Sequence, residues 1–142
     1  MFVDRCHHGK EEAEIFYRLD KGTEAAIVQA LAHEHDRGRQ RAAAYAAAVR
    51  RYVPSDHWSG ARLARASGDY AKLLRVHIER ETQELFPAME GSLAAEDDRL
   101  VAAFERIENE QIGVGTHERL HAMIATLPAR ISPWVRTPVL TN

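Results

Sequence analysis

The sequence predicts an all-α fold, an antiparallel bundle of helices around one core. Helix-forming Ala, Leu, Arg and Glu dominate the composition, and β-branched residues are sparse. Apolar positions recur at spacings of three and four residues, and no segment shows the alternation of a strand. Helices joined by short turns pack antiparallel, and ligand sites in such bundles are built from side chains that point inward from several helices.

Turn and capping residues divide the chain into five expected helices. Their approximate ranges are 3–17, 23–52, 61–86, 93–110 and 117–128. The first ends at the turn formed by residues 20–22, and Thr23 is the expected N-cap of the second, which Pro54 ends. Pro87 marks the exit of the third helix.

The last two helices are shorter. Ser92 is the expected N-cap of the fourth, and the acidic residues 96–98 suit its positive end. The sequence GVG at 113–115 breaks that helix, and Thr116 caps the extra C-terminal one. The SPWVRTP tail reads as irregular.

Length and charge limit the function classes. We expect a single domain over residues 1–142, because 45% of its residues are hydrophobic and can form one core. A formal net charge of -2 provides no basic field for nucleic acid or for a membrane surface. No apolar stretch approaches the roughly 20 residues that cross a bilayer. The single cysteine, Cys6, and the lack of a leader fit a reducing cytoplasm.

One motif occurs twice. HHGKEEAEIF at 7–16 and HIERETQELF at 77–86 share His, three residues, then Glu. Residues four apart on an α-helix lie about 40° apart around its axis, so each His and Glu can point at one locus. Both copies face apolar residues, and burying a lone carboxylate costs several kcal/mol. A divalent cation would offset that cost, whereas on an exposed face the same motif is only a weak helical pair.

A third segment adds an imidazole from another helix. LAHEHDRGR places His35, with His33 as an alternative, on the second long helix. Nitrogen and oxygen ligands without thiolate suit iron, manganese or zinc, and a set with open positions suits non-haem iron. Because two carboxylates can bridge two metal ions about 3.5 to 4 Å apart, the pattern favours a dinuclear centre.

Four stretches together resemble the hemerythrin-like family of HHE cation-binding domains. They are FVDRCHHGKEE, EHDRGR, LLRVHIERETQELFP and ENEQIGVGTHERLHAMI, and they span residues 2 to about 127. The resemblance implies a four-helix up-and-down bundle around two iron ions, with both Glu residues as bridges. Matched position by position, the implied metal ligands are His7, Glu11, His35, His77 and Glu81. The Gly-Arg pair at 38–39 favours His35 over His33 by the same analogy.

The sequence departs from the family at its start. The family's first helix, which supplies one more His, has no counterpart here, so a sixth ligand is unassigned. Three explanations stay open: the natural product is longer, a second copy fills the gap, or His117 or His121 replaces the ligand. The gap would expose an apolar groove, and we therefore expect a homodimer that completes the bundle.

Several residues near the motif have two interpretations. Glu14 and Glu84 are either extra ligands or turned outward at the bundle end. Tyr70 either reaches the metal pocket with its hydroxyl or caps the core. His8 points about 100° away from His7 on an α-helix, which places it behind the ligands or at the surface.

HERLH at 117–121 has the HExxH form of zinc hydrolases, in which Glu118 would be the general base. No His, Asp, Glu or Cys follows it to serve as a third ligand. We expect instead that Leu120 and His121 pack this short helix on the bundle.

By resemblance, the function is the handling of O2, peroxide, nitric oxide or iron by a carrier, a sensor or a redox protein. An apolar wall around the open metal position favours reversible binding, and a nearby proton source favours O–O cleavage. A metal-poor dimerisation module is the alternative.

Overall fold

The computed structural model describes residues 3–135, and all of its regular elements are helical. The first helix, residues 3–19, consists of η1 (Val3–His8), η2 (Glu11–Phe16) and α1 (Tyr17–Leu19). After it come α2 (Ala25–Arg50), then α3 (His57–Arg80), η3 (Glu81–Leu85) and α4 (Phe86–Leu93) as one continuous rod. The last described elements are η4 (Ala94–Glu96), α5 (Asp97–Gln111) and α6 (Thr116–Val135).

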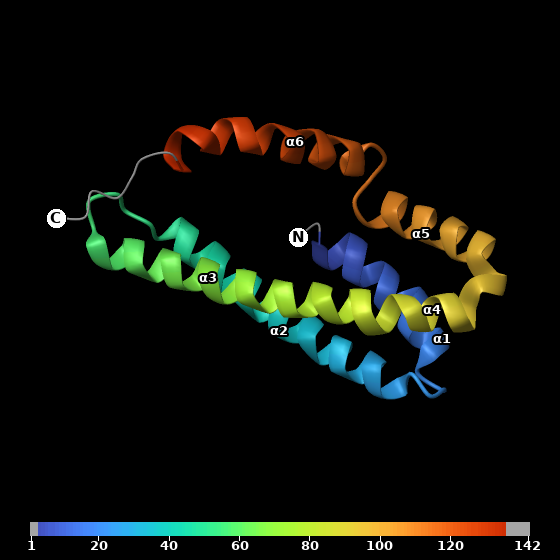
Figure 1. Cartoon of the computed structure of the whole chain (residues 1–142). Helices are drawn as coiled ribbons and strands as arrows, with labels where there is room; N and C mark the ends of the chain where they lie inside the picture. Colours follow the sequence, from blue (N-terminus) through green and yellow to red (C-terminus); the bar gives the residue numbers. More distant parts are fainter. Residues whose placement is uncertain (1–2, 136–142) are drawn as a thin grey trace.

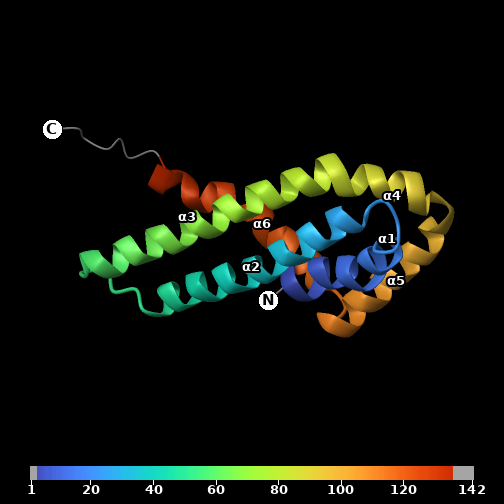
Figure 2. The ribbon, with the colours of Figure 1, turned by 90° about the horizontal axis from the view of Figure 1, so that it is seen from below.

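The arrangement confirms an all-α antiparallel bundle with an additional C-terminal helix. α2 and α3 run side by side in opposite directions and form a long hairpin (Figures 1 and 2). The first helix packs on α2, and α5 packs along η1 and η2. α6 runs apart from the hairpin along the top of the molecule in Figure 1. Of the helices in residues 3–135, none is long and apolar enough to cross a membrane.

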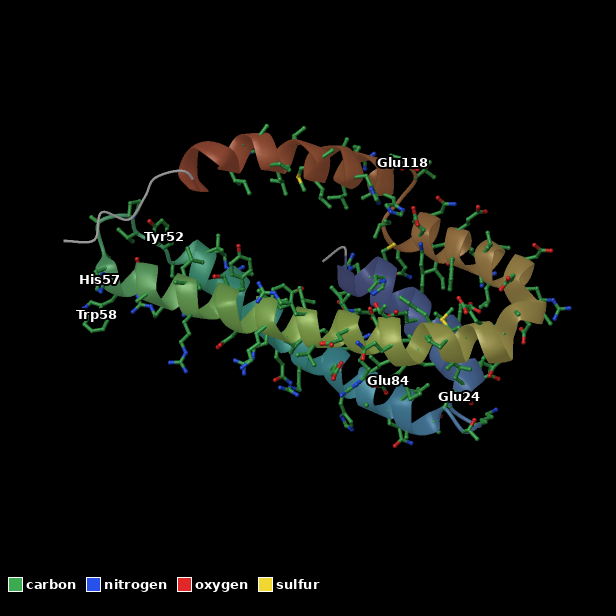
Figure 3. The ribbon with its side chains drawn as sticks, viewed as in Figure 1. Glu24, Tyr52, His57, Trp58, Glu84 and Glu118 are labelled. Atoms are coloured by element: carbon green, nitrogen blue, oxygen red, sulfur yellow. The ribbon has the colours of Figure 1, made fainter. Side chains whose placement is uncertain are left out.

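The apolar core lies at one end of this bundle. It forms where the first helix, the start of α2, η3, α4 and α5 meet. Its buried members are Ile15, Phe16, Leu19, Val28, Leu31, Leu85, Leu93 and Leu100. Burying such a side chain stabilises the fold by roughly 1.5–3 kcal/mol. The hairpin tip, residues 43–68, buries only Ser59, and Tyr52, His57 and Trp58 lie exposed there (Figure 3).

Three expected helix starts were wrong. α3 begins at His57 rather than near residue 61, because Asp56 accepts hydrogen bonds from the backbone N–H groups of residues 58 and 59, each at 3.0 Å. Thr23 does not cap α2, since its hydroxyl donates to the Glu24 side chain. Ser92 lies inside α4, and α5 starts only at Asp97.

Two expected helix ends were also wrong. The rod that begins at His57 passes Pro87 and continues to Leu93. The wider turns of η3 precede this proline at the start of α4, a position where its missing N–H costs little. α6 passes Pro128 and reaches Val135, so the first part of the SPWVRTP tail is helical; the rest lies outside the described residues. The break before α6 was correctly placed, because Gly113 and Gly115 adopt φ of 83° and 74°.

Candidate metal centre

Six imidazole and carboxylate side chains gather beside the apolar core. The first helix provides three of them, α2 one, and the junction of α3 with η3 two. They are His7, His8, Glu11, His35, His77 and Glu81. The five residues singled out in the sequence therefore lie together, and His8 joins them. All except His7 are buried, with His35 at 0% exposure.

His8 is buried in the first helix. It lies three residues before Glu11 and seven before Ile15, which are also buried, and residues at these spacings share one face of a helix. Its ring stacks on that of His35, with centroids 3.9 Å apart, and only 4% of the residue is exposed. Of the two positions expected for His8, behind the ligands or at the surface, the surface position was wrong, because that expectation measured the rotation from His7, whose side chain is itself 44% exposed.

The six side chains form two overlapping groups. One contains His8, His35 and His77. The other contains His7, Glu11, His77 and Glu81. Within each group, one donor atom from every residue lies within 4.8 Å of the others.

The carboxylates connect these groups. Glu11 directs Oε2 to His35 Nε2 at 3.2 Å and Oε1 to His7 Nε2 at 3.6 Å. Glu81 Oε1 lies 2.8 Å from His77 Nε2 and 3.3 Å from His7 Nε2. Glu11 therefore spans from one group to the other.

Outer carboxylates fix the orientation of two histidines. His35 Nδ1 donates to Glu12 Oε1 at 2.7 Å, and Arg39 holds the same oxygen at 2.6 Å. His77 Nδ1 donates to Glu34 Oε2 at 3.1 Å, and Arg80 pairs with the other Glu34 oxygen. When each ring is neutral, its one proton lies on Nδ1 toward the carboxylate, and Nε2 is left as the lone-pair atom that faces the interior.

The electrostatics of the centre favour the anionic form of Glu81, the neutral form of His8 and the protonated forms of His7 and His77. Burial, together with repulsion from His35 and other nearby cationic groups, lowers the pKa of the His8 ring to about 3. Burial opposes ionisation of Glu81, but the hydrogen bond from His7 and the charge of the neighbouring His77 outweigh it and lower the pKa of this carboxyl. A hydrogen bond to Glu81 raises the pKa of His7.

Several buried polar atoms at the centre make no hydrogen bond. They are both ring nitrogens of His8, Oε2 of Glu11, and Nε2 of His35 and of His77. Buried polar atoms in folded proteins nearly always have a partner, so a cluster of lone pairs without one requires an explanation. Imidazole and carboxylate donors directed at a common interior fit divalent transition-metal ions.

Other residues weighed in the sequence lie outside both groups. Glu14 pairs with Arg18 at 2.8 Å and with Arg106 at 3.4 Å. Glu84 is exposed and 3.6 Å from Arg80. Tyr70 stacks on Tyr45 with ring centroids 6.5 Å apart. Within residues 3–135, no hydrogen bond joins its hydroxyl to the histidine cluster.

The histidines of HERLH also lie elsewhere. His117 Nδ1 is 3.0 Å from Glu108 Oε1, and His121 Nε2 is 2.8 Å from His117 Nε2. In the described part of the chain, no group of three metal-binding side chains includes either residue. Glu118 lies at the start of α6 (Figure 3). The three-ligand arrangement of a zinc hydrolase is therefore not formed by these residues.

Comparison with known proteins agrees with this geometry. The family described as hemerythrin HHE cation-binding domain matches residues 1–89, which hold all six clustered side chains. No curated protein and no solved structure shows significant similarity to the chain. Since the match covers more than half of the 142 residues, the chain belongs to the hemerythrin HHE cation-binding domain family and is a metal-binding protein.

Proposed function

We propose that the chain holds two iron ions and uses them to bind a small ligand such as O2 or nitric oxide, as a carrier or a sensor. The six proposed metal ligands are His7, His8, Glu11, His35, His77 and Glu81. The observation that carries this proposal is the set of buried donor atoms without hydrogen bonds, which spans three helical segments. Manganese or zinc accept similar donors, but a set of imidazoles and carboxylates with open positions favours iron.

The contacts divide the ligands between two ions. His77 can serve only one ion, because its Nδ1 is committed to Glu34. His7 and His77 share Glu81 and would hold one ion, whereas His8 and His35 are stacked and would hold the other. Glu11 has one oxygen toward each pair and is the proposed bridge. His8 thereby supplies the sixth ligand that sequence comparison with the family left unassigned.

The surroundings favour binding over turnover. Bound iron would supply open coordination positions and redox chemistry. Phe16 stacks on His35 with ring centroids 5.2 Å apart, and Leu31 and Leu85 are fully buried in the adjoining core. Tyr70, the phenol weighed as a proton source, stacks on Tyr45 instead. An apolar wall supports reversible binding, while reaction with peroxide would require a proton donor.

Metal analysis of paired variants tests this proposal. Glu81→Gln keeps the shape of a buried side chain but removes a charged donor, so we expect loss of iron loading and of the near-ultraviolet ligand-to-metal bands. Glu84→Gln is the matched control, because Glu84 lies in the same η3 segment and is exposed. Full iron content in Glu81→Gln would refute the ligand assignment.

We also propose that the partner of the chain is a second copy of itself. The exposed large apolar residues in the described part of α6 include Met123, Ile124, Leu127 and Ile131. With Leu120 they form one stripe at the spacing of a helix–helix seam. An isolated helix is marginal in water, and the same stripe on a two-fold related copy is self-complementary.

Sedimentation equilibrium tests this pairing. We expect a dimer for the unaltered chain and a monomer for Ile124→Glu. A monomeric unaltered chain at micromolar concentration would contradict it. A dimer that never takes up metal would instead favour the interaction module.

A further inference from the structure

A second pair of histidines lies at the start of α6, away from the buried centre. His117 and His121 are one helical turn apart. Their ring centroids are 4.6 Å apart, the ring planes make an angle of 44°, and the two Nε2 atoms approach to 2.8 Å. His121 is exposed and His117 is partly so, with 39% of its side chain accessible.

Contacts from two other helices hold this pair in place. Glu108 of α5 accepts a hydrogen bond from His117 Nδ1 at 3.0 Å. Lys10 of the first helix donates to the other oxygen of Glu108 at 2.5 Å. A carboxylate can only accept, so His117 carries its proton on Nδ1 and presents the Nε2 lone pair to His121.

Two imidazole nitrogens at this distance repel each other unless a proton or a cation lies between them. When both rings are neutral, either one proton lies between the nitrogens or both lone pairs bind one cation. Metal–imidazole bonds of about 2.0–2.1 Å reach both nitrogens from a single point. A carboxylate on the far nitrogen of a ligating histidine is the usual support of such a site, because it fixes the ring and makes it more basic.

We propose that His117 and His121 form a second, exposed metal site for Zn²⁺, Ni²⁺ or Cu²⁺, with Glu108 as its orienting carboxylate. Water completes the coordination. Two nitrogen donors without a charged oxygen favour these late metals over iron and manganese. The site is a chelating pair rather than a hydrolase centre, because within the described residues no third metal-binding side chain joins the two histidines.

Calorimetric titration of the full chain with Zn²⁺ tests the proposal, with iron content recorded in each sample. We expect the unaltered protein to bind one Zn²⁺ without releasing iron. His121→Ala should weaken this binding at least about tenfold and leave iron loading unchanged, because the bond from His117 to Glu108 is kept. Glu108→Gln should weaken it about 10- to 100-fold. His57→Ala, which removes an exposed histidine at the hairpin tip, is the control and should have no effect.

Two results would overturn the proposal. One is an unchanged zinc affinity in His121→Ala. The other is zinc uptake that is matched by iron release, which would place the zinc in the buried centre. Since iron is measured in the same samples, an iron-free buried centre would be recognised separately and would leave this test valid.

Discussion

The buried centre and the exposed histidine pair use the same local device in different surroundings. In each, a carboxylate accepts a hydrogen bond from a histidine Nδ1, and the Nε2 atom of that histidine faces a second side-chain atom that can bind a metal ion. His35 is 0% exposed, whereas 39% of the His117 side chain is accessible. Water can satisfy the exposed pair when no ion is bound. The buried nitrogens and carboxylates have no such substitute, so burial, more than residue type, determines how strongly each site depends on metal.

Removal of metal should show the largest difference between the two sites in their effect on stability. A bound ligand at 1,000 times its Kd stabilises a fold by about 4 kcal/mol, so two buried ions would contribute about 8 kcal/mol. We expect chelation to lower the unfolding temperature of the iron-loaded protein sharply. Chelation of zinc from His117 and His121 should change it little, because both states of that site are solvated. Thermal unfolding followed by circular dichroism measures both effects. Equal shifts of the unfolding temperature after the two treatments would contradict the difference proposed between the buried and the exposed site.

Loss of packing under the buried centre should have the next largest effect. Leu31→Ala removes a fully buried side chain of the core and should lower the free energy of unfolding by about 2–5 kcal/mol. Met123→Ala, two residues beyond the exposed pair, should change it by less than about 0.5 kcal/mol in the monomer. Urea denaturation measures both. A similar loss in the two variants would mean that α6 packs against the rest of its own chain.

A smaller effect is expected from the support of a buried ligand. Glu12→Gln weakens the hydrogen bond that orients His35 and should reduce metal affinity about 10- to 100-fold without abolishing loading. Competition with a chromophoric chelator measures the change. Glu14→Gln is the control, because Glu14 pairs with arginines and not with a histidine. An unaltered affinity in Glu12→Gln would show that packing alone fixes the His35 ring.

The smallest effect concerns the contact that links the two regions. Lys10 joins the first helix to Glu108 through a partly buried ion pair. Lys10→Met should cost up to about 1 kcal/mol of stability and should weaken zinc binding more than iron binding. Stability and both affinities can be measured on one preparation. Equal weakening of both metals would mean that Lys10 supports the first helix as a whole.

The sequence allowed the helices and most of the buried cluster to be predicted for a physical reason. His and Glu four residues apart share a face on any regular helix, and the two copies of that spacing identified His7, Glu11, His77 and Glu81. His8 was not identified, because the expectation placed the inward face at His7, from which His8 is about 100° away on a helix. Its spacing of three residues from Glu11 and seven from Ile15 was the signal that could have found it.

The helix ends near proline were also predicted incorrectly from the sequence. Pro87 and Pro128 were expected to lie at or near helix ends, yet both are enclosed by continuous helix. Proline is tolerated where the hydrogen bond it cannot donate is already missing, as at the start of α4. The pairing of Glu108 with His117 could not be foreseen, because it depends on how the turn at Gly113 and Gly115 returns the chain.

Iron stoichiometry of the unaltered chain and of His8→Ala is the most direct test of the buried centre. Anaerobic loading with Fe²⁺, removal of excess metal and elemental analysis should give two irons per chain for the unaltered protein. His8→Ala should retain the ion held by His7, His77 and Glu81 and lose the other, while His33→Ala, which lacks an exposed histidine of α2, should keep both. An unaltered chain that takes up no iron, or a His8→Ala variant that still holds two ions, would contradict the assignment.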